Sequence, residues 1–233
     1  MRAYVSLWSA DPLALGEAVD RLGPVVDGFH LDVFDGHSVR DLLFGPDLVA
    51  ALRRRTDALL DVHLMVSDPD YWTDRFADAG ADMITVQGAS CADPGATLAR
   101  IRERGCQPSL GVEVHEPVEA AIAHFAAVER VLVLGTVLGV KGHPLDPATP
   151  DRVARLVAAR GGEPRPLVVV DGGIRRHTVP ALAAAGADGV VPGSLVFGDA
   201  DPLRAVAEIA GLASGCAAAP ATTFWTDAGR GPS

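Results

Sequence analysis

The sequence predicts an α/β protein with a single (β/α)8 architecture, the TIM barrel, in which eight parallel strands alternate with helices. Short apolar runs recur eight times along the 233 residues, and a helix-start signal follows each run. The hydrophobic fraction of 48% suits a large buried core, and no linker divides the chain. A doubly wound sheet fits less well, because it usually has fewer strands and no Gly-x-Gly-x-x-Gly follows the first run.

The expected strands and helix starts alternate in order along the chain. The apolar runs lie at 3–7, 28–33, 59–65, 83–87, 107–114, 131–134, 167–170 and 189–191. Proline and helix-capping residues lie between and after them at 9–12, 45–46, 67–69, 93–94, 116–117, 149–151, 175–178 and 199–202. Each expected strand is therefore followed by an expected helix, as a barrel requires.

Two further patterns bear on the organisation of the chain. Ala-Gly-Ala-Asp occurs at 79–82 and again at 185–188, each time between a helix and a strand, where glycine supplies a left-handed cap. The segment 214–233 is rich in Ala, Gly, Thr and Pro and lacks helical periodicity. We expect a barrel domain at 1–213 and a flexible tail at 214–233, although Phe224-Trp225 could dock on a partner subunit.

Composition argues against several classes of partner. The net charge of −10 comes from 20 basic and 30 acidic residues, so nucleic acid is not an expected partner. The three cysteines are widely spaced without a Cys-x-x-Cys pair, which fits a reducing compartment. No secretory signal opens the chain, and no run of about 18 apolar residues occurs. We expect a cytoplasmic protein with no membrane partner.

Polar side chains interrupt the apolar runs on one face of each strand. His30 lies on the same face as Asp32, Asp61 shares a face with His63 and Met65, and Asp171 ends a third strand. Burying such groups costs free energy that needs an explanation. In a barrel the C-terminal strand ends form the active site, and the candidate residues fall there: Ser6, His30, Asp32, His63, Asp171 and the Gly193-Ser194 pair.

Taken singly, these polar residues have structural interpretations. His30 could be a hydrogen-bonded core histidine, Asp61 a solvent contact at a strand end, and Asp171 the acceptor in a tight turn. Together, His30, Asp32, His63 and Asp171 would converge in one polar cavity. Two imidazoles and two carboxylates suit one divalent ion per chain, zinc first, with iron, manganese or cobalt as alternatives.

Glycines follow the expected strands six, seven and eight. Gly172-Gly173 and Gly193-Ser194 occupy the positions where such barrels hold a phosphate on backbone N–H groups. Gly139 and Gly142 could add further N–H donors. Any one of these glycines could serve only a turn, but their shared placement favours a phosphorylated small-molecule ligand.

Five segments resemble the signatures of the ribulose-phosphate 3-epimerase family, in the family's order. They are Ser-Leu-Trp-Ser-Ala-Asp at 6–11, His-Leu-Asp-Val-Phe-Asp-Gly-His at 30–37, Asp-Val-His-Leu-Met-Val at 61–66, Val-Asp-Gly-Gly-Ile at 170–174 and Gly-Ser at 193–194. The resemblance covers residues 3–200. It implies a barrel of the ribulose-phosphate-binding type, and, as is common in the family, a homo-oligomer.

The resemblance also implies a metal-dependent isomerase that epimerises C3 of a ketose phosphate, D-ribulose 5-phosphate to D-xylulose 5-phosphate, through an enediolate. It implies His30, Asp32, His63 and Asp171 as metal ligands, with Asp32 and Asp171 also forming the acid/base pair. Contacts with the sugar phosphate are expected from Ser6, His63, Met65, Gly139, Gly142, Gly172, Gly173, Gly193 and Ser194. Epimerisation needs a base on one face of the carbon and an acid on the other, which two aspartates from separate strands can supply.

Some positions depart from the family pattern. The family has an Asn-Pro-Gly-Phe-Gly-Gly-Gln-like run where residues 137–143 read Val-Leu-Gly-Val-Lys-Gly-His. Phe34 and Leu134 replace common methionines, and Gln87 stands where histidine is frequent. These changes bear on the sugar more than on the reaction, so another ketose phosphate, such as allulose 6-phosphate, remains an alternative.

Two other functions remain open. Lys141, the only lysine, could form a Schiff base in an aldolase, although its loop position between glycines offers no obvious reason for a lowered pKa. The second alternative is a catalytically silent phosphosugar-binding protein. Such a sensor would not need both carboxylates, which argues against it.

Overall fold

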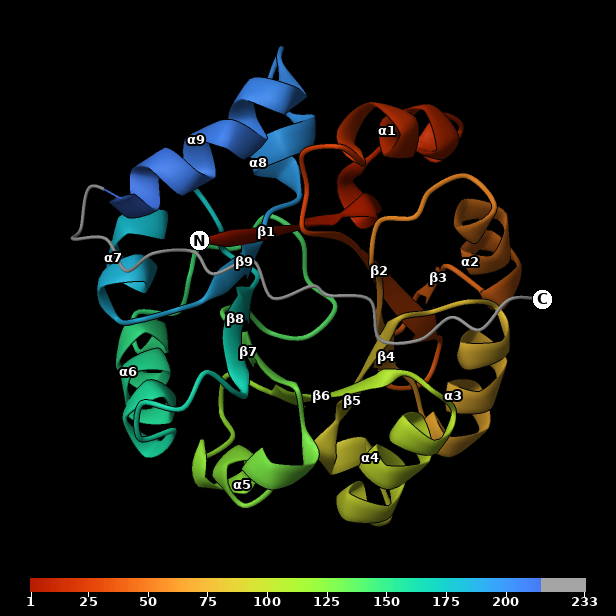
Figure 1. Ribbon diagram of the computed structural model, residues 1–233, viewed down its shortest axis with the longest axis vertical. Coiled ribbons are helices and arrows are strands. Elements are labelled where there is room, and N and C mark those ends of the chain that lie inside the picture. Colours follow the sequence, from red (N-terminus) through yellow and green to blue (C-terminus); the bar gives the residue numbers. More distant parts are fainter. Residues whose placement is uncertain (215–233) are drawn as a thin grey trace.

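The computed structural model describes residues 1–214, which contain a closed ring of eight parallel strands (Figure 1). The strands are β1 (Arg2–Ser6), β2 (Gly28–Asp35), β4 (Leu60–Met65), β5 (Met83–Gln87), β6 (Gln107–Val112), β7 (Arg130–Leu134), β8 (Leu167–Asp171) and β9 (Gly189–Val191). Each pairs with the next in this order, and β9 pairs with β1 to close the ring. The predicted (β/α)8 barrel is confirmed, with all eight expected strands present.

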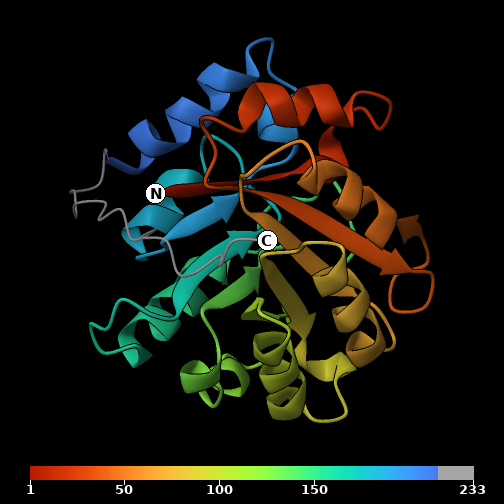
Figure 2. The same cartoon turned by 45° about the vertical axis from the view of Figure 1, so that its right-hand side comes forward.

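Helices surround the strands (Figures 1 and 2). They are α1 (Leu15–Leu22), α2 (Pro46–Arg53), α3 (Pro69–Asp78), α4 (Pro94–Glu103), α5 (Glu119–Ile122), α6 (Thr149–Ala159), α7 (Val179–Ala184), α8 (Ser194–Phe197) and α9 (Pro202–Ser214), with 3-10 turns η1 (Leu7–Ser9), η2 (Gly88–Ser90) and η3 (Phe125–Ala127). Within residues 1–214, no helix has both the length and the apolar character needed to cross a bilayer.

Local sequence signals explain most helix starts. The side chains of Asp68 and Asp93 cap α3 and α4 by accepting hydrogen bonds from backbone N–H groups of the first turn, as the sequence predicts. The signal at 9–12 behaves differently, because Asp11 accepts from the Leu13 N–H in a turn and α1 begins only at Leu15. Helix α9 continues to Ser214, and the rest of the expected tail, including Phe224-Trp225, lies outside the described residues.

The repeated Ala-Gly-Ala-Asp corners have the same structure. Gly80 and Gly186 adopt φ values of +97° and +92°, which confirms the predicted left-handed caps. At the first corner, Asp82 Oδ2 accepts from Leu60 N at 2.9 Å and from Arg53 Nη1 at 2.7 Å. At the second, Asp188 makes the equivalent bonds to Val168 N and Arg160 Nη1. Each corner therefore ties the start of one strand to its neighbour, at the end of the barrel opposite the candidate site.

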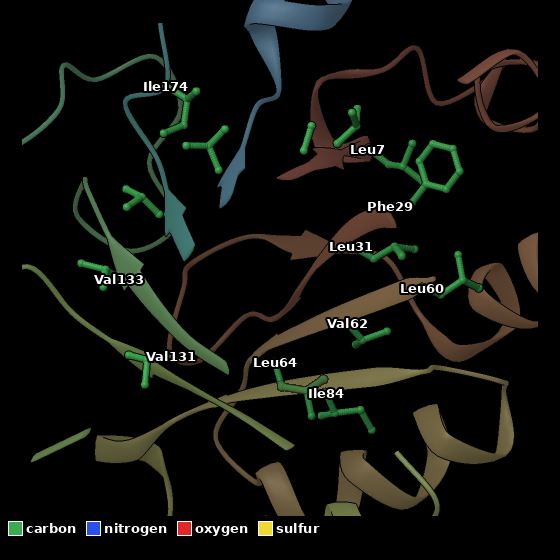
Figure 3. Close-up of a cluster of buried hydrophobic side chains, with 14 of the residues drawn as sticks. Leu7, Phe29, Leu31, Leu60, Val62, Leu64, Ile84, Val131, Val133 and Ile174 are labelled. Atoms are coloured by element: carbon green, nitrogen blue, oxygen red, sulfur yellow. The ribbon is translucent and has the colours of Figure 1, made fainter. Parts of the chain in front are cut away.

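Apolar side chains fill the space between strands and helices. Leu31, Val62, Ile84 and Val131 belong to one large buried cluster that spans successive strands (Figure 3). A second, smaller cluster is made of Tyr4, Leu132, Leu134, Val169 and Val191. Because side chains alternate along a strand, this second set lies on the face that points into the barrel. The same face carries His30, Asp32, Asp61 and His63, so the barrel interior contains buried polar side chains as well as this apolar cluster.

Candidate active site

A cavity of about 220 Å³ opens at the C-terminal ends of the barrel strands. Its lining includes every residue that the sequence places in contact with substrate or in acid/base chemistry, namely Ser6, Asp32, His63, Met65, Gly139, Gly142, Asp171, Gly172, Gly173, Gly193 and Ser194. His30 is fully buried beside Asp32 and Asp171. The closed barrel therefore gathers side chains from distant parts of the chain around one opening.

Four ligand-type side chains form a cluster at this cavity. His30 Nε2 lies 3.4 Å from Asp32 Oδ1 and 3.7 Å from Asp171 Oδ2. His63 Nδ1 lies 3.6 Å and 3.9 Å from the same two oxygens. One ligand atom from each residue lies within 4.8 Å of the other three. A tetrahedral ion with bonds of about 2.1 Å separates its ligands by about 3.4 Å, so these atoms could close around one ion with small movements.

The imidazole nitrogens that face the cluster fit a metal ion. His30 Nε2 and His63 Nδ1 are buried and have no hydrogen-bond partner among the described residues. Asp61 Oδ2 lies 2.6 Å from His30 Nδ1, which holds the proton on that nitrogen and leaves Nε2 to bind an ion. Burial disfavours a charged imidazole, but Asp61 and Asp32 outweigh burial and raise the pKa of His30 well above its usual value. A metal ion would therefore displace a proton from Nε2.

The two carboxyl groups of the cluster have different proton affinities. Burial, assisted by the negative charge of Asp32 and opposed by His30, raises the pKa of Asp171 to about 6. Burial also opposes ionisation of Asp32, but His30 and His63 outweigh it and hold the pKa of Asp32 well below its usual range. One carboxyl group is therefore ionised while the other exchanges its proton close to neutral pH.

Gln87 holds the second imidazole. Its amide nitrogen lies 2.7 Å from His63 Nε2, and its oxygen has no partner among the described residues. The amide packs over Gly111, where a Cβ would come within 2.6 Å of it. With the amide turned over, its oxygen would accept the Nε2–H of His63, and Nδ1 would keep a lone pair for an ion. Gln87, a departure from the family pattern, thus lies against a candidate ligand.

Arg130 is a buried residue of the site that the sequence did not reveal. It pairs with Asp61 inside the barrel, and both side chains are fully buried. The interpretation of Asp61 as a solvent contact is therefore wrong. The expected strand began at Val131, which left Arg130 outside it. The sequence nevertheless contains a pattern that predicts its position. Two-residue alternation places Arg130 on the same inner face of the strand as Leu132 and Leu134.

Glycine is required at the ends of β8 and β9. Gly172 and Gly173 adopt φ values of +89° and +70°, and a Cβ on Gly172 would lie 2.3 Å from Thr136 Oγ1. A Cβ on Gly193 would lie 2.6 Å from Ser9 Oγ. A larger residue at either strand end would displace the neighbouring loop into the cavity or away from it.

The divergent loop at 137–143 lines the cavity beside these glycines through residues 137–142. Gly139 packs against Val39, which lies in the connection between β2 and the short strand β3 (Leu42–Leu43). Lys141 Nζ lies 4.6 Å from the centre of the Trp8 ring and donates a hydrogen bond to Trp8 O. Burial lowers the pKa of Lys141, opposed by Asp32, so the expectation that nothing would lower it is wrong. The lysine thus connects the loop after β7 to the turn after β1.

The fold and the cluster together define a class, that of (β/α)8-barrel enzymes with a histidine and aspartate centre at the C-terminal strand ends. Solved structures share this fold. KGPDC from Streptococcus mutans has a TM-score of 0.70 at 16% identity, covering 93% of this chain and 99% of that chain. Orotidine 5'-phosphate decarboxylase from Pyrococcus horikoshii OT3 has a TM-score of 0.66 at 13% identity, covering 91% and 99%.

Sequence comparison identifies the family within this class. The model of the Ribulose-phosphate 3 epimerase family matches residues 3–197. Ribulose-phosphate 3-epimerase of Bacillus subtilis is 35% identical over 209 residues, covering 88% of this chain and 96% of that protein. The protein of the same name from Rhodobacter capsulatus is 38% identical over 196 residues, covering 82% and 84%. This chain belongs to the ribulose-phosphate 3-epimerase family and is a carbohydrate epimerase.

Proposed function

We propose that the protein epimerises C3 of a ketose phosphate, with D-ribulose 5-phosphate and D-xylulose 5-phosphate as the interconverted pair. The observation that carries this proposal is the pair of buried aspartates, Asp32 and Asp171, which share one cavity but differ in proton affinity. Family membership supports the same reaction. The pentose phosphates are proposed because relatives named ribulose-phosphate 3-epimerase match this chain over most of their length, 96% for the Bacillus subtilis protein.

Asp32 and Asp171 reach the cavity from β2 and β8, which are separated in the ring by β1 and β9. An ionised carboxylate can remove the C3 proton from one face, and a protonated carboxyl group can return a proton to the other face. The low pKa of Asp32 keeps it ionised, as the base must be, and the raised pKa of Asp171 suits the acid, with the roles exchanged in the reverse direction. Ser6 Oγ donates to Asp32 Oδ2 at 2.9 Å, which holds that carboxylate in place.

We infer that His30, Asp32, His63 and Asp171 hold one divalent ion, with zinc as the first candidate and iron, manganese or cobalt as alternatives. The unpartnered His30 Nε2 and His63 Nδ1 support this inference. When bound, the ion supplies positive charge near the oxygens that become negative as the C3 proton leaves. The two carboxyl groups perform the proton transfers, one removing the C3 proton from its face and the other donating its own proton to the opposite face.

The phosphate end of the substrate is assigned to the glycine-rich strand ends. Backbone N–H groups near Gly172, Gly173, Gly193 and Ser194 would bind it, with further N–H donors from Gly139 and Gly142 in the adjacent loop. Lys141 adds a positive charge at the same opening. A cytoplasmic location, a homo-oligomeric assembly and a barrel domain at 1–213 remain predictions from the sequence and the family resemblance.

The reaction is tested by following C3 directly. Ketose phosphates of five and six carbons, including allulose 6-phosphate, are incubated with the protein in D2O, and loss of the C3 proton signal and appearance of the epimer are measured by NMR. We expect exchange and epimerisation to be fastest with ribulose 5-phosphate. Faster turnover of a six-carbon sugar would change the substrate but keep the reaction, and no exchange with any sugar would contradict the proposal. Substrate trapped on Lys141 by borohydride would favour the aldolase.

A further inference from the structure

The barrel interior contains an ion pair that takes no part in proton transfer. Arg130 of β7 and Asp61 of β4 are both fully buried, and neither lines the cavity. Arg130 Nη1 and Nη2 donate to the two oxygens of Asp61, each at 2.6 Å. A buried ion pair is weak evidence for stability, because removing both charges from water offsets most of their attraction. The presence of this pair inside the barrel therefore needs an explanation other than fold stability.

The guanidinium of Arg130 is fixed on several sides. Its Nε donates to Ser109 Oγ at 3.0 Å, and Nη2 also donates to Thr85 Oγ1 at 2.7 Å. The ring of Tyr4 lies 5.3 Å from its central carbon. Its hydrogen-bond partners come from the three consecutive strands β4, β5 and β6. Its planar, two-pronged geometry therefore determines the orientation of the Asp61 carboxylate.

Asp61 transmits this orientation to the candidate metal centre. The Oδ2 atom that accepts from Arg130 also lies 2.6 Å from His30 Nδ1. The opposite ring nitrogen, His30 Nε2, faces Asp32 and Asp171 and has no hydrogen-bond partner among residues 1–214. A continuous chain of hydrogen bonds thus runs from β7 to Nδ1 of the His30 ring, whose opposite nitrogen faces the cluster.

We propose that Arg130 is a positioning residue for the metal centre. It fixes the Asp61 carboxylate, which holds the His30 ring with Nε2 directed at the ion, and the pair thereby sets the affinity of the centre for a divalent cation. This inference rests on the proposed metal centre. Loss of such an outer partner typically weakens metal binding by about 10–100-fold.

The test measures metal affinity independently of activity. Metal-free protein is titrated with Zn²⁺ or Co²⁺ in competition with a chromogenic chelator, and folding of each variant is checked by circular dichroism. We expect Arg130→Met to raise the dissociation constant by at least about tenfold. Arg130→Lys keeps the charge but loses the two-pronged geometry, and should recover part of the affinity. The visible spectrum of the Co²⁺ form should change with Arg130→Met, because the geometry around the ion changes.

Two further variants separate positioning from folding. Arg130→Met alone leaves Asp61 as an unpaired buried charge, so the double variant Arg130→Met with Asp61→Asn removes both charges and preserves an acceptor for His30. We expect this variant to fold and still to bind the ion at least about tenfold more weakly. Arg53→Met is the matched control, because it breaks an Arg–Asp pair, Arg53 with Asp82, at the opposite end of the barrel.

The possible results distinguish the positioning role of Arg130 from the existence of the metal centre. Arg53→Met should lower thermal stability but keep the metal dissociation constant within about twofold of the wild type. A folded Arg130 variant with wild-type metal affinity would overturn the positioning role while leaving the metal centre intact. A wild-type protein that binds neither Zn²⁺ nor Co²⁺ would overturn the metal centre itself, and the Arg130 proposal with it.

Discussion

Asp32 and Asp171 are residues of the same type, but their surroundings give the two carboxyl groups different pKa values. Asp32 accepts from Ser6 and lies close to both imidazoles, and its interactions with them outweigh burial and lower its pKa. Asp171 is 20% exposed on its side chain, against 5% for Asp32, yet the adjacent negative charge and its own burial raise its pKa. In the proposed reaction, the environment rather than the residue type would therefore decide which aspartate is the acid and which is the base.

Replacement of either aspartate tests this assignment. Asp32→Asn and Asp171→Asn should each reduce epimerisation by at least about 100-fold, because each removes proton transfer on one face. Each metal-loaded variant should still exchange the C3 proton of the epimer whose C–H bond faces the remaining carboxylate. Exchange with each epimer is measured by NMR in D2O, with metal content determined in parallel. Near-normal turnover in either metal-loaded variant would remove that aspartate from the mechanism.

The sequence predicts the cluster residues well because they obey a local rule. Two-residue alternation places His30 beside Asp32, and barrel geometry places the strand ends together. Arg130 and Gln87 obey the same alternation, but their roles depend on partners in other strands, Asp61 and His63. Pairing across strands requires the register, which no local pattern in a single sequence supplies.

At the scale of elements, the loop after β7 is the part of the site in which this chain differs most from its family pattern. It is braced by Val39 on one side and by Trp8 on the other. The sequence predicts neither contact, because both partners lie about 100 residues or more away along the chain. The short strand β3, which pairs antiparallel with the end of β2, was also not predicted, since two residues carry no periodicity.

Lys141→Met tests the role of this loop in substrate binding. The Michaelis constant for phosphorylated substrates should rise by up to about tenfold, with little change in turnover, if one partly exposed charge contact is lost. Lys141→Arg keeps the charge and should retain more of the affinity, and Arg54→Met serves as a surface control. A Michaelis constant that is unchanged in Lys141→Met would mean that the ammonium group does not contact the phosphate.

The end of β2 offers a test of stability against pH. Asp35 accepts from both the backbone N–H and the hydroxyl of Ser67. Burial opposes its ionisation, but these bonds outweigh burial and lower the pKa of Asp35 to about 2. Because the folded pKa lies below the unfolded value of about 3.9, its stabilisation is complete above about pH 4 and is lost as the pH falls towards about 2.

Asp35→Asn should therefore lower the free energy of unfolding by about 1–2 kcal/mol at pH 7. The difference from wild type should shrink between about pH 4 and pH 2. Urea unfolding of the wild type and of Asp35→Asn at several pH values in this range measures the difference in unfolding free energy, and the exposed Asp57→Asn variant is the control. A difference that stays constant down to pH 2 would show that ionisation of Asp35 contributes nothing.

At the scale of the whole molecule, eight strands and their alternation with helices follow from the sequence, and closure follows from the number of strands. The arrangement of apolar and polar side chains inside the barrel does not follow from the sequence, because it depends on which strands become neighbours. Tyr4, Leu132 and Val169 belong to an apolar cluster, while Arg130 reaches from β7 to Asp61 on β4. The candidate centre lies beside this ion pair.

Metal binding should stabilise the entire barrel. An ion at about 100 times its dissociation constant adds about 2.7 kcal/mol to the folded state, which corresponds to a rise of about 5–10 °C in Tm for a chain of this size. Differential scanning calorimetry with chelator and with added Zn²⁺ measures the shift. Asp32→Asn should show a smaller shift, and an equal shift in that variant would place the stabilising ion elsewhere.

The packed interior beneath the cluster also determines the order in which a bound sugar phosphate and a bound metal ion would leave the site. Arg130, Thr85 and Tyr4 are almost completely buried in contact with one another inside the barrel and do not line the cavity, so they fill the interior behind the cluster. An ion held by the cluster would then leave through the opening at the C-terminal strand ends, where the sugar phosphate is proposed to bind. A bound sugar would therefore retain the ion, and an enzyme at work in the presence of its substrate should resist stripping by a chelator far longer than the same enzyme at rest.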